Sequence, residues 1–347
     1  MHVVLVGAGN IGSHEAPLLV RMNGVTAITV VDPDKFDCGN LRSQAIGRAV
    51  VGRGKAAAVA ATLRQISPGL IVNSFAARAE AVPAGRLRCD ILVAGVDSRL
   101  TRMNLGRIQH RLGIPFYVDA GVAGAAGSRT VRVSVFGLGS EVPCYQCGFS
   151  EMHYQNIDLR YPCQAGKPGA PTNAPAWLGA MAASTAAWAV ERLLGGDTSG
   201  VGFETRIDAS KERPSLLYAR LINNPRCRFD HDVWPLPEQA SQSLGVSELV
   251  SDDCEVRSAG GLFAVGARCD VCARTSRRLR HCRFGVNGIE ERCACGGVMR
   301  PTALDWRDVL TAEDIRSDRS LRGIGLRAGD LLLVSSPDGR RALELGD

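Results

Sequence analysis

Residues 5–12 read LVGAGNIG, which places three glycines, Gly7, Gly9 and Gly12, between an apolar run and an amphipathic stretch. This G-x-G-x-x-G spacing at a strand-to-helix turn is typical of nucleotide binding, because the bare amides at a helix N-terminus attract phosphate oxygens. Asp32 lies twenty residues beyond Gly12, at the end of the next apolar run. A carboxylate at that position accepts hydrogen bonds from a ribose diol. Together these features predict an adenine-nucleotide site, without deciding between NAD and ATP.

Around this turn, short apolar runs alternate with amphipathic stretches up to about residue 137. Such alternation indicates crossover units and a mainly parallel sheet. We expect strands at His2–Val6, Thr26–Val31, Ile91–Val96, Phe116–Val118, Val131–Val135, Phe203–Ile207 and Leu216–Leu221. We expect helices at Ile11–Met22, Lys55–Gln65, Leu100–Leu112 and Trp177–Leu194. The predicted fold class is therefore α/β, with a Rossmann-like, doubly wound sheet.

The chain of 347 residues is long enough for two domains, since a domain usually takes roughly 100–200 residues. We place the nucleotide-binding domain at residues 1–234, with a crossover loop rich in Gly, Pro and polar residues at 148–176. Residues 235–250 have the composition of a linker. Residues 251–347 are expected to form a small zinc-ribbon module with a tail of β-strands.

The composition narrows the class of protein. The net charge of +6 is modest and dispersed, so we expect no nucleic-acid partner, and we interpret the basic stretch Arg277–Arg283 as solvated surface. No signal peptide precedes the first strand, and the most apolar stretch is shorter than the ~20 residues that span a membrane. We therefore expect a cytoplasmic protein without membrane contact. Thiols stay reduced there, so the twelve cysteines point to metal binding or catalysis.

Charged residues downstream of the glycine turn favour ATP. Arg42 follows the predicted ribose site, and Lys55 begins the next helix. Both side chains bind polyphosphate oxygens, and a dehydrogenase has no need of them. Asp97 ends a strand at the carboxyl edge of the sheet. Its carboxylate would hold Mg²⁺ against the phosphates, cap the following helix, or do both.

These motifs, in this order, resemble the ubiquitin-activating-enzyme superfamily, which includes bacterial adenylyltransferases of the thiamine and molybdopterin pathways. The resemblance covers about residues 1–231 and rests on Gly7–Gly12, Asp32-x-Asp34, Asn40-Leu41 with Arg42 and Gln44, Gly52-Arg53-Gly54-Lys55 and Ala94-Gly95-Val96-Asp97. It implies that the enzyme adenylates the C-terminal glycine of a ubiquitin-like protein. It also implies an ATP and Mg²⁺ site made by Gly7, Gly9, Asn10, Ile11, Gly12, Asp32, Asp34, Asn40, Arg42, Gln44, Lys55 and Asp97.

Two departures from the family pattern concern cations. The family usually places an arginine three residues after the asparagine, whereas Arg42 is two residues after Asn40. Family members also commonly carry an N-terminal extension whose arginine reaches an active site, often that of a partner subunit. Either Arg48, Arg53 or Arg102 substitutes here, a partner protein supplies the charge, or adenylation is slow.

The close cysteine pairs predict two zinc sites. Cys144, Cys147, Cys227 and His231 match the ligands and the tetrahedral preference of Zn²⁺, and they resemble the structural zinc site of the family. The second set is Cys269, Cys272, Cys293 and Cys295, which has the spacing of a zinc ribbon. Cys254 and Cys282 remain outside this count, and either could replace a ligand.

Cys163 stands alone in the crossover loop. In the resembled family a cysteine on this crossover often receives the acyl group from AMP as a thioester, and an exposed thiolate is a competent nucleophile. We therefore expect Cys163, Arg42, Lys55 and Asp97 to be catalytic, with hand-off to a conjugating enzyme that docks on the ribbon and tail. The resemblance also implies a homodimer. The alternatives are an adenylyltransferase for a sulfur carrier, a small molecule or tRNA, then an NAD-dependent oxidoreductase and a zinc-held scaffold without catalysis.

Overall fold

The computed structural model describes residues 1–124, 127–155, 174–210, 212–283, 291–315 and 319–346. The chain forms two compact units. The first consists of Met1–Ala79, Cys89–His110 and Ile114–Asp232, and the second of Glu80–Arg88, Arg111–Gly113 and Val233–Asp347. The second unit is therefore not continuous in sequence, because two short segments from the first half of the chain belong to it.

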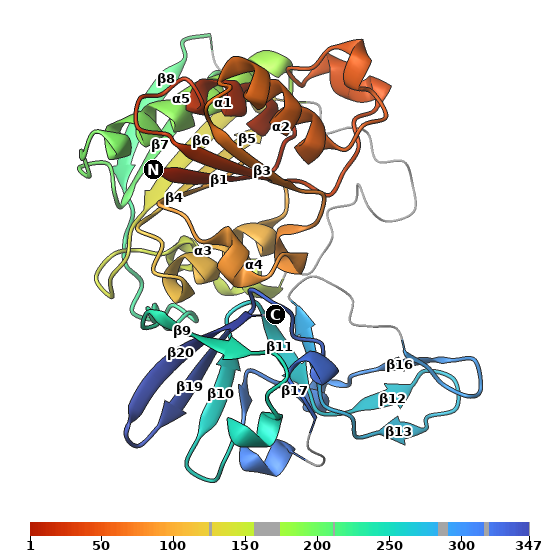
Figure 1. Cartoon of the computed structure of the whole chain (residues 1–347). Helices are drawn as coiled ribbons and strands as arrows, with labels where there is room; N and C mark the ends of the chain where they lie inside the picture. Colours follow the sequence, from red (N-terminus) through yellow and green to blue (C-terminus); the bar gives the residue numbers. More distant parts are fainter. Residues whose placement is uncertain (125–126, 156–173, 211, 284–290, 316–318, 347) are drawn as a thin grey trace. The chain divides into compact units, whose positions relative to one another are not determined.

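An eight-stranded sheet organises the first unit, in the order β3-β2-β1-β4-β5-β6-β7-β8 (Figure 1). The first five of these neighbours run parallel, whereas β6, β7 and β8 are antiparallel. The strand bounds are His2–Val6 (β1), Ala27–Val31 (β2), Ile71–Phe75 (β3), Ile91–Ala94 (β4), Phe116–Ala123 (β5), Thr130–Phe136 (β6), Phe203–Asp208 (β7) and Ser215–Arg220 (β8). A mixed α/β fold with a large, mainly parallel sheet is thus confirmed.

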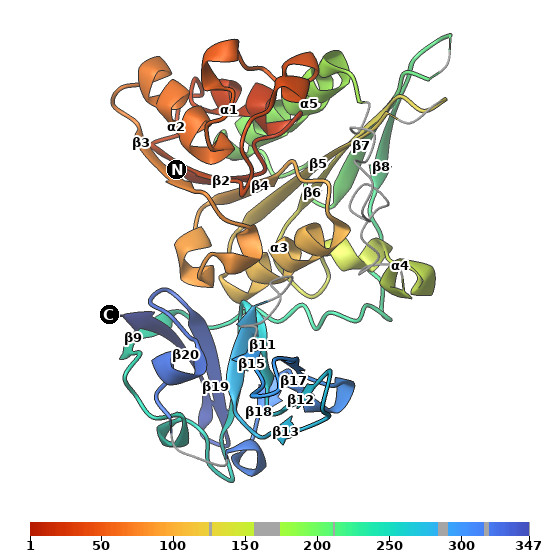
Figure 2. The same cartoon turned by 90° about the vertical axis from the view of Figure 1, so that its right-hand side faces the viewer.

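Helices cover both faces of this sheet (Figures 1 and 2). One face carries α1 (Gly12–Leu19), α2 (Lys55–Ile66) and α5 (Ala176–Leu194), and the other carries α3 (Arg99–Arg111) and α4 (Glu151–Gln155). The first helix ends at Leu19, three residues before the predicted Met22. None of the helices described has the length and apolar character that crossing a membrane requires.

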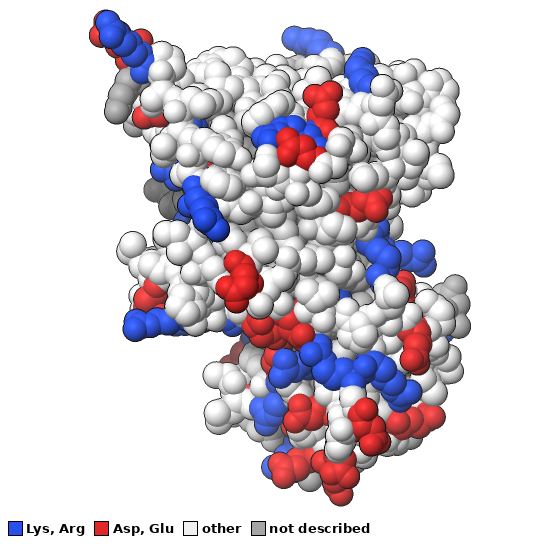
Figure 3. All heavy atoms as spheres, turned by 90° about the vertical axis from the view of Figure 1, so that its left-hand side faces the viewer, with Lys and Arg blue, Asp and Glu red and all other residues white. Residues whose placement is uncertain are grey.

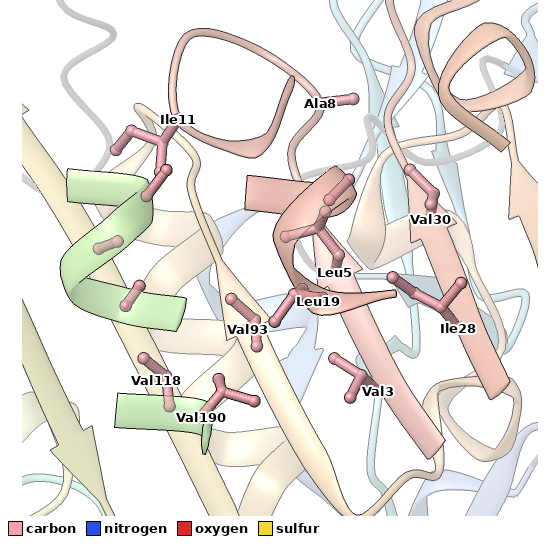
Figure 4. Packing of buried hydrophobic residues seen from close by; sticks show 14 of the residues in the cluster. Val3, Leu5, Ala8, Ile11, Leu19, Ile28, Val30, Val93, Val118 and Val190 are labelled. Carbon is pink, nitrogen blue, oxygen red and sulfur yellow. The ribbon is translucent and has the colours of Figure 1, made fainter. Parts of the chain in front are cut away.

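Alternation along the strands builds the core under α1 and α5. Val3 and Leu5 of β1 point to the same side, where they meet Ile28 and Val30 of β2 and the helical residues Leu19 and Val190 (Figure 4). All six side chains are fully buried. Each Å² of apolar area removed from water stabilises the fold by roughly 25 cal/mol. This burial fixes the position of the strands whose carboxyl ends carry the candidate site.

The described residues of the second unit form three small sheets. A five-stranded sheet has the order β18-β10-β19-β20-β9, with bounds Val309–Leu310, Glu255–Ser258, Leu331–Ser336, Gly339–Gly346 and Pro237–Ser241. A three-stranded sheet contains β14 (Arg280–Arg283), β11 (Gly261–Ala264) and β17 (Trp306–Arg307). The range 235–250, which we expected to be a linker, contains β9, and β9 pairs in parallel with β20.

A four-stranded sheet completes the second unit and carries the second cysteine set. Its order is β13-β12-β16-β15, with bounds Thr275–Ser276, Ala267–Cys269, Val298–Arg300 and Glu291–Arg292. In the three-stranded sheet, Arg283 of β14 forms a buried ion pair with Asp330. On the face of the molecule shown in Figure 3, basic side chains lie among acidic ones.

A buried carboxyl in α1 gives the first unit a pH-dependent stability. Glu15 is fully buried, and neither carboxylate oxygen has a hydrogen-bond partner in the part of the chain described. Burial raises its pKa to about 8, above the roughly 4.3 of an exposed glutamate. Between these values the unfolded chain releases the proton while the folded chain keeps it, so stability falls as the pH rises through this window.

We predict that Glu15→Gln removes this loss. Near pH 4.5 the free energies of unfolding of the variant and the parent chain differ by a fixed amount. As the pH rises from there to about 8, the variant becomes more stable relative to the parent, by an amount on the order of a few kcal/mol. Thermal unfolding of both proteins from pH 4.5 to 9 measures the difference. A difference that does not change with pH would contradict the burial of an unpartnered carboxyl.

Candidate functional site

The glycine turn between β1 and α1 is formed by close backbone contacts. Gly7 has a φ of 96°, and a Cβ atom there would lie 2.8 Å from the carbonyl oxygen of Gly95. A Cβ on Gly12 would lie 1.9 Å from the carbonyl oxygen of Gly7. Around Gly9, by contrast, a Cβ would meet no described atom within 4 Å. Gly7 and Gly12 therefore make the turn possible, and Gly9 leaves its backbone open to a ligand.

Asn10 contributes its side chain to packing. Its Nδ2 donates to the carbonyl oxygen of Ala174 at 3.0 Å, just before α5 begins. A Cβ on Gly179 of α5 would lie 2.0 Å from Asn10 Oδ1, so this contact also needs a glycine. The side chain of Asn10 thus fixes the turn to α5. Within the turn, the groups left to bind phosphate are the backbone amides at the start of α1.

Asp32 ties the turn to the end of β2. Its two carboxylate oxygens accept hydrogen bonds from the backbone amides of Ala8, at 2.7 Å, and Asp34, at 2.8 Å. Burial raises the pKa of Asp32, and the two backbone hydrogen bonds oppose that rise. Each oxygen keeps a further lone pair, so a ribose hydroxyl could bind in addition.

Lys55 is a largely buried cation at the same edge of the sheet. Its side chain is 10% exposed, and its Nζ lies 3.3 Å from Oδ2 of Asp34, a carboxylate that is 65% exposed. The ammonium also lies 5.9 Å from the centre of the Phe36 ring. Because Asp34 is exposed and Lys55 is largely buried, an incoming phosphate can replace Asp34 as the partner of the Lys55 ammonium. The Asp34 carboxylate can then bind water or a cation instead.

The segment after β2 presents Arg42. A reciprocal pair of hydrogen bonds, each 3.1 Å, joins Asp37 to Asn40 at the start of a 3₁₀ helix spanning Cys38–Arg42. The backbone amide of Ala45 donates to Ser13 Oγ in α1 at 3.0 Å, which fastens the segment beside the glycine turn. Arg42 is exposed and makes no hydrogen bond or ion pair with the described residues. Its guanidinium is therefore available to an anion.

Gln44 lies in the same segment and is half-buried. Its Oε1 is buried without a hydrogen-bond partner among the described residues. Asn40 contributes its side chain to the link with Asp37, so its contact with a nucleotide stays a prediction.

Asp97 follows β4 and is exposed. Its neighbours Gly95 and Val96 touch the glycine turn, because a Cβ on Gly7 would meet both of them. Asp97 is not needed as the cap of α3, because Ser98 Oγ accepts a hydrogen bond from the backbone amide of Thr101 in that helix, at 3.2 Å. Asp97 makes no hydrogen bond or ion pair in the part of the chain described, which leaves its carboxylate open to a cation.

Arg102 is part of a buried charge cluster that the sequence analysis did not identify. Its guanidinium donates to Asp119 Oδ1 at 2.5 Å and to the carbonyl oxygen of Val96. Asp119, in the middle of β5, is fully buried and also accepts from Arg132 at 3.2 Å and Tyr117 Oη at 3.1 Å. These contacts raise the pKa of Arg102 against the opposing effect of burial.

Arg102 is therefore fixed in the protein, and the expectation that it could serve as a mobile arginine for the phosphates is not met. Its bond to the Val96 carbonyl instead holds the chain beside Asp97. Arg48 and Arg53 are both exposed and remain the candidates for that charge within this chain.

The first candidate metal cluster, Cys144, Cys147, Cys227 and His231, joins two distant segments of the first unit. The Cys144 Sγ lies 3.8 Å from Cys147 Sγ and 3.7 Å from Cys227 Sγ, and Cys147 Sγ lies 3.4 Å from His231 Nε2. A tetrahedron with Zn–S bonds of about 2.3 Å has edges of about 3.8 Å, so the donor set fits Zn²⁺. His231 adopts a φ of 54°, a strained value for histidine that places its ring against the thiols.

The second cluster closes the four-stranded sheet. Cys269 Sγ lies 3.4 Å from Cys295 Sγ, and Cys272 Sγ lies 3.6 Å from Cys293 Sγ. Backbone amides of Val271 and Cys272 point at Cys269 Sγ, as is usual around a metal-bound thiolate. Cys254 and Cys282 belong to neither cluster in the described chain. Cys163 lies outside the described residues.

Three comparisons place the chain among known proteins. The sequence model of the ThiF family matches residues 1–228. The chain is 32% identical over 155 residues to the SAMP-activating enzyme E1 of Haloferax volcanii, a match that covers 43% of this chain and 53% of that protein. It is 38% identical over 73 residues to the ATP-dependent ubiquitin transferase-like protein Cap2 of Enterobacter hormaechei, covering 21% of this chain and 12% of that protein. The matched region thus spans about half or less of these relatives.

Solved structures show the same fold. MccB of E. coli matches with a TM-score of 0.53 and 20% identity, over 68% of this chain and 66% of that chain. MccB with bound ATP matches with a TM-score of 0.51 and 22% identity, over 65% of each chain. At this identity the likeness concerns the fold alone.

The two clusters predict two zinc ions per chain. We expect Cys227→Ser to lower the zinc content from two to one and to reduce the unfolding temperature, because the metal joins two segments of the first unit. Cys254→Ser, which alters a cysteine outside both clusters, is the matched control and should keep two. Elemental analysis of the purified proteins measures this, and a parent chain with no zinc, or a Cys227 variant with two, would contradict the assignment.

Proposed function

Because the chain belongs to the ThiF family of adenylyltransferase-like proteins, we propose that it uses ATP to adenylate the C-terminal glycine of a ubiquitin-like protein. One observation carries the proposal: Arg42, Lys55 and Asp97 all follow strands that end beside the same glycine turn. The Lys55 ammonium is buried, and Arg42 and Asp97 have no partner among the described residues. That is the edge at which open α/β sheets bind ligands.

The chemistry follows from the charges. The carboxylate is ionised at neutral pH, since an α-carboxyl group has a pKa of about 3.3–3.7, so no side-chain base is required. One of its oxygens bonds to the α-phosphorus of ATP as the bond from that phosphorus to pyrophosphate breaks. Two anions must approach each other, and Lys55 and Arg42 lower their repulsion and stabilise the charge that gathers on pyrophosphate.

Each remaining group has a positioning role. The amides at the start of α1 bind phosphate, and Asp32 holds the turn in place and accepts a ribose hydroxyl. Asp97 and Asp34 fit Mg²⁺, because they are exposed carboxylates at this edge, and such a cation would supply further charge screening. ATP bound to MccB, which shares the fold, and the names of the two curated relatives support ATP and a protein substrate over NAD.

The proposal extends to the acyl acceptor and the partners. Cys163 would take the activated glycine as a thioester, with release of AMP, and a conjugating enzyme would then receive it. A homodimer is consistent with β8, an edge strand whose Leu216 and Leu217 are exposed.

Pyrophosphate exchange into ATP, in the presence of ubiquitin-like proteins that end in glycine, tests adenylation. Lys55→Gln should lower the exchange rate by about 10²–10³-fold, the usual cost of removing one transition-state charge contact. Lys35→Gln is the matched control, because Lys35 is exposed near the same loop, and it should keep the parent rate within about twofold. Equal losses in the two variants, or no exchange in the parent chain with any such protein, would contradict the proposed site.

The role of Cys163 is tested separately. Cys163→Ala should abolish a thiol-sensitive adduct on a nonreducing gel while pyrophosphate exchange continues at the parent rate, because exchange needs only the adenylation step. Cys38→Ala, which alters an exposed cysteine of the first unit, serves as control and should keep the adduct. An adduct that survives in the Cys163 variant would remove this residue from the reaction.

A further inference from the structure

The positive charge of the chain is concentrated in the zinc-ribbon segment, residues 267–300. This segment holds eight arginines, no lysine and three acidic residues, a net charge of +5, whereas the whole chain carries +6. Four thiolates around one Zn²⁺ would add a charge of −2 and leave the segment positive. The modest charge of the whole chain, from which we expected no nucleic-acid partner, therefore conceals one strongly basic module.

Strand register gathers three of these arginines on one face of the four-stranded sheet. Arg268 of β12 lies directly opposite Arg300 of β16. Arg292 of β15 lies opposite Val298, which is two residues from Arg300 along the same strand. Directly opposite residues, and residues two apart, share a face of a sheet. We call Arg268, Arg292 and Arg300 the arginine face.

The other side of the same sheet is the metal side. Cys269 pairs with Met299 in the register next to the arginine pair, and both are buried with Cys293. All three residues of the arginine face are exposed. Packing of the metal side thus buries one face of the sheet, and the arginine face is left towards solvent.

Among the described residues, Arg268 and Arg292 form no ion pair, and Arg300 forms a long one with Asp270. Like charges directly opposite in a sheet are destabilising, so the Arg268–Arg300 pair costs stability. Among acidic side chains described in this segment, Asp270 approaches Arg300 only to 4.0 Å, and it already accepts a hydrogen bond from the amide of Val298. An external anion would relieve this repulsion.

The surface composition indicates which anion. The described part of the segment exposes one large apolar side chain, Val271, and no aromatic ring. Protein interfaces rely on buried aromatic and apolar anchors, and single-stranded nucleic acids stack their bases on aromatic rings. A duplex backbone needs neither, because its binding comes from phosphate neutralisation and counterion release.

We propose that the arginine face binds the phosphate backbone of duplex nucleic acid without sequence preference, with the exposed Arg274 and Arg277 at the ends of β13 adding contacts. Three to five phosphate contacts correspond to a slope of log K against log salt of about −2.7 to −4.5. Affinity would then fall by roughly 40- to 500-fold between 50 and 200 mM salt. This binding goes beyond adenylation and does not depend on it.

Fluorescence anisotropy with a labelled 25-base-pair DNA duplex and the zinc-loaded full chain tests the proposal. The triple variant Arg268→Gln, Arg292→Gln, Arg300→Gln should weaken binding at 50 mM salt by at least about 30-fold and make the salt slope shallower by about 3. Arg322→Gln, Arg340→Gln, Arg341→Gln removes the same charge from exposed positions elsewhere in the second unit, and should leave the slope unchanged.

Replacement of the arginine face by three lysines keeps the charge and should keep most of the slope, which guards against loss of folding in the glutamine variant. Unchanged zinc content in all variants shows that the ribbon is intact. No duplex binding at 50 mM salt, equal losses in the two glutamine triples, or binding of poly-glutamate with no binding of the duplex would each overturn the proposal, the last in favour of an acidic protein.

Discussion

Close backbone contact between the turn after β1 and the chain after β4 is the constraint on which the candidate site depends. The contact exists because Gly7 and Gly12 lack side chains, and because Gly7 can adopt its positive φ. It lies where the strand order of the parallel sheet reverses, between β1 and β4. The helix amides, the lysine and the free carboxylate therefore share one edge.

Buried polar bonds then fix that edge. Asp32 uses both oxygens to join the turn to the end of β2, and Arg102 joins α3 to Asp119 and to the chain before Asp97. In each case the chain satisfies a buried charge with backbone groups or an opposite charge, which makes these positions costly to move. Arg42 and Asp97, by contrast, are exposed and make no hydrogen bond or ion pair with the described residues, so both are accessible to a ligand.

Local patterns were sufficient to predict four of the five parallel strands, the glycine turn and the membership of both cysteine clusters, since each depends on short spacing or on ligand chemistry. The pattern did not reveal β3, because Ile71–Phe75 mixes polar and apolar residues and its one buried side chain is Val72. The Arg102–Asp119 pair and the arginine face were also missed. Both arise from pairing between distant segments, and a one-residue change of register would place the arginines on the other side of the sheet.

Calorimetric titration of the chain with ATP and Mg²⁺, and separately with NAD, shows which nucleotide the glycine turn holds. We expect saturable binding of ATP at one site per chain, weakened when Lys55 loses its charge, and no measurable heat with NAD. Saturable binding of NAD with no binding of ATP would rule out the proposed site, because the cations at the carboxyl edge would then have no polyphosphate to neutralise.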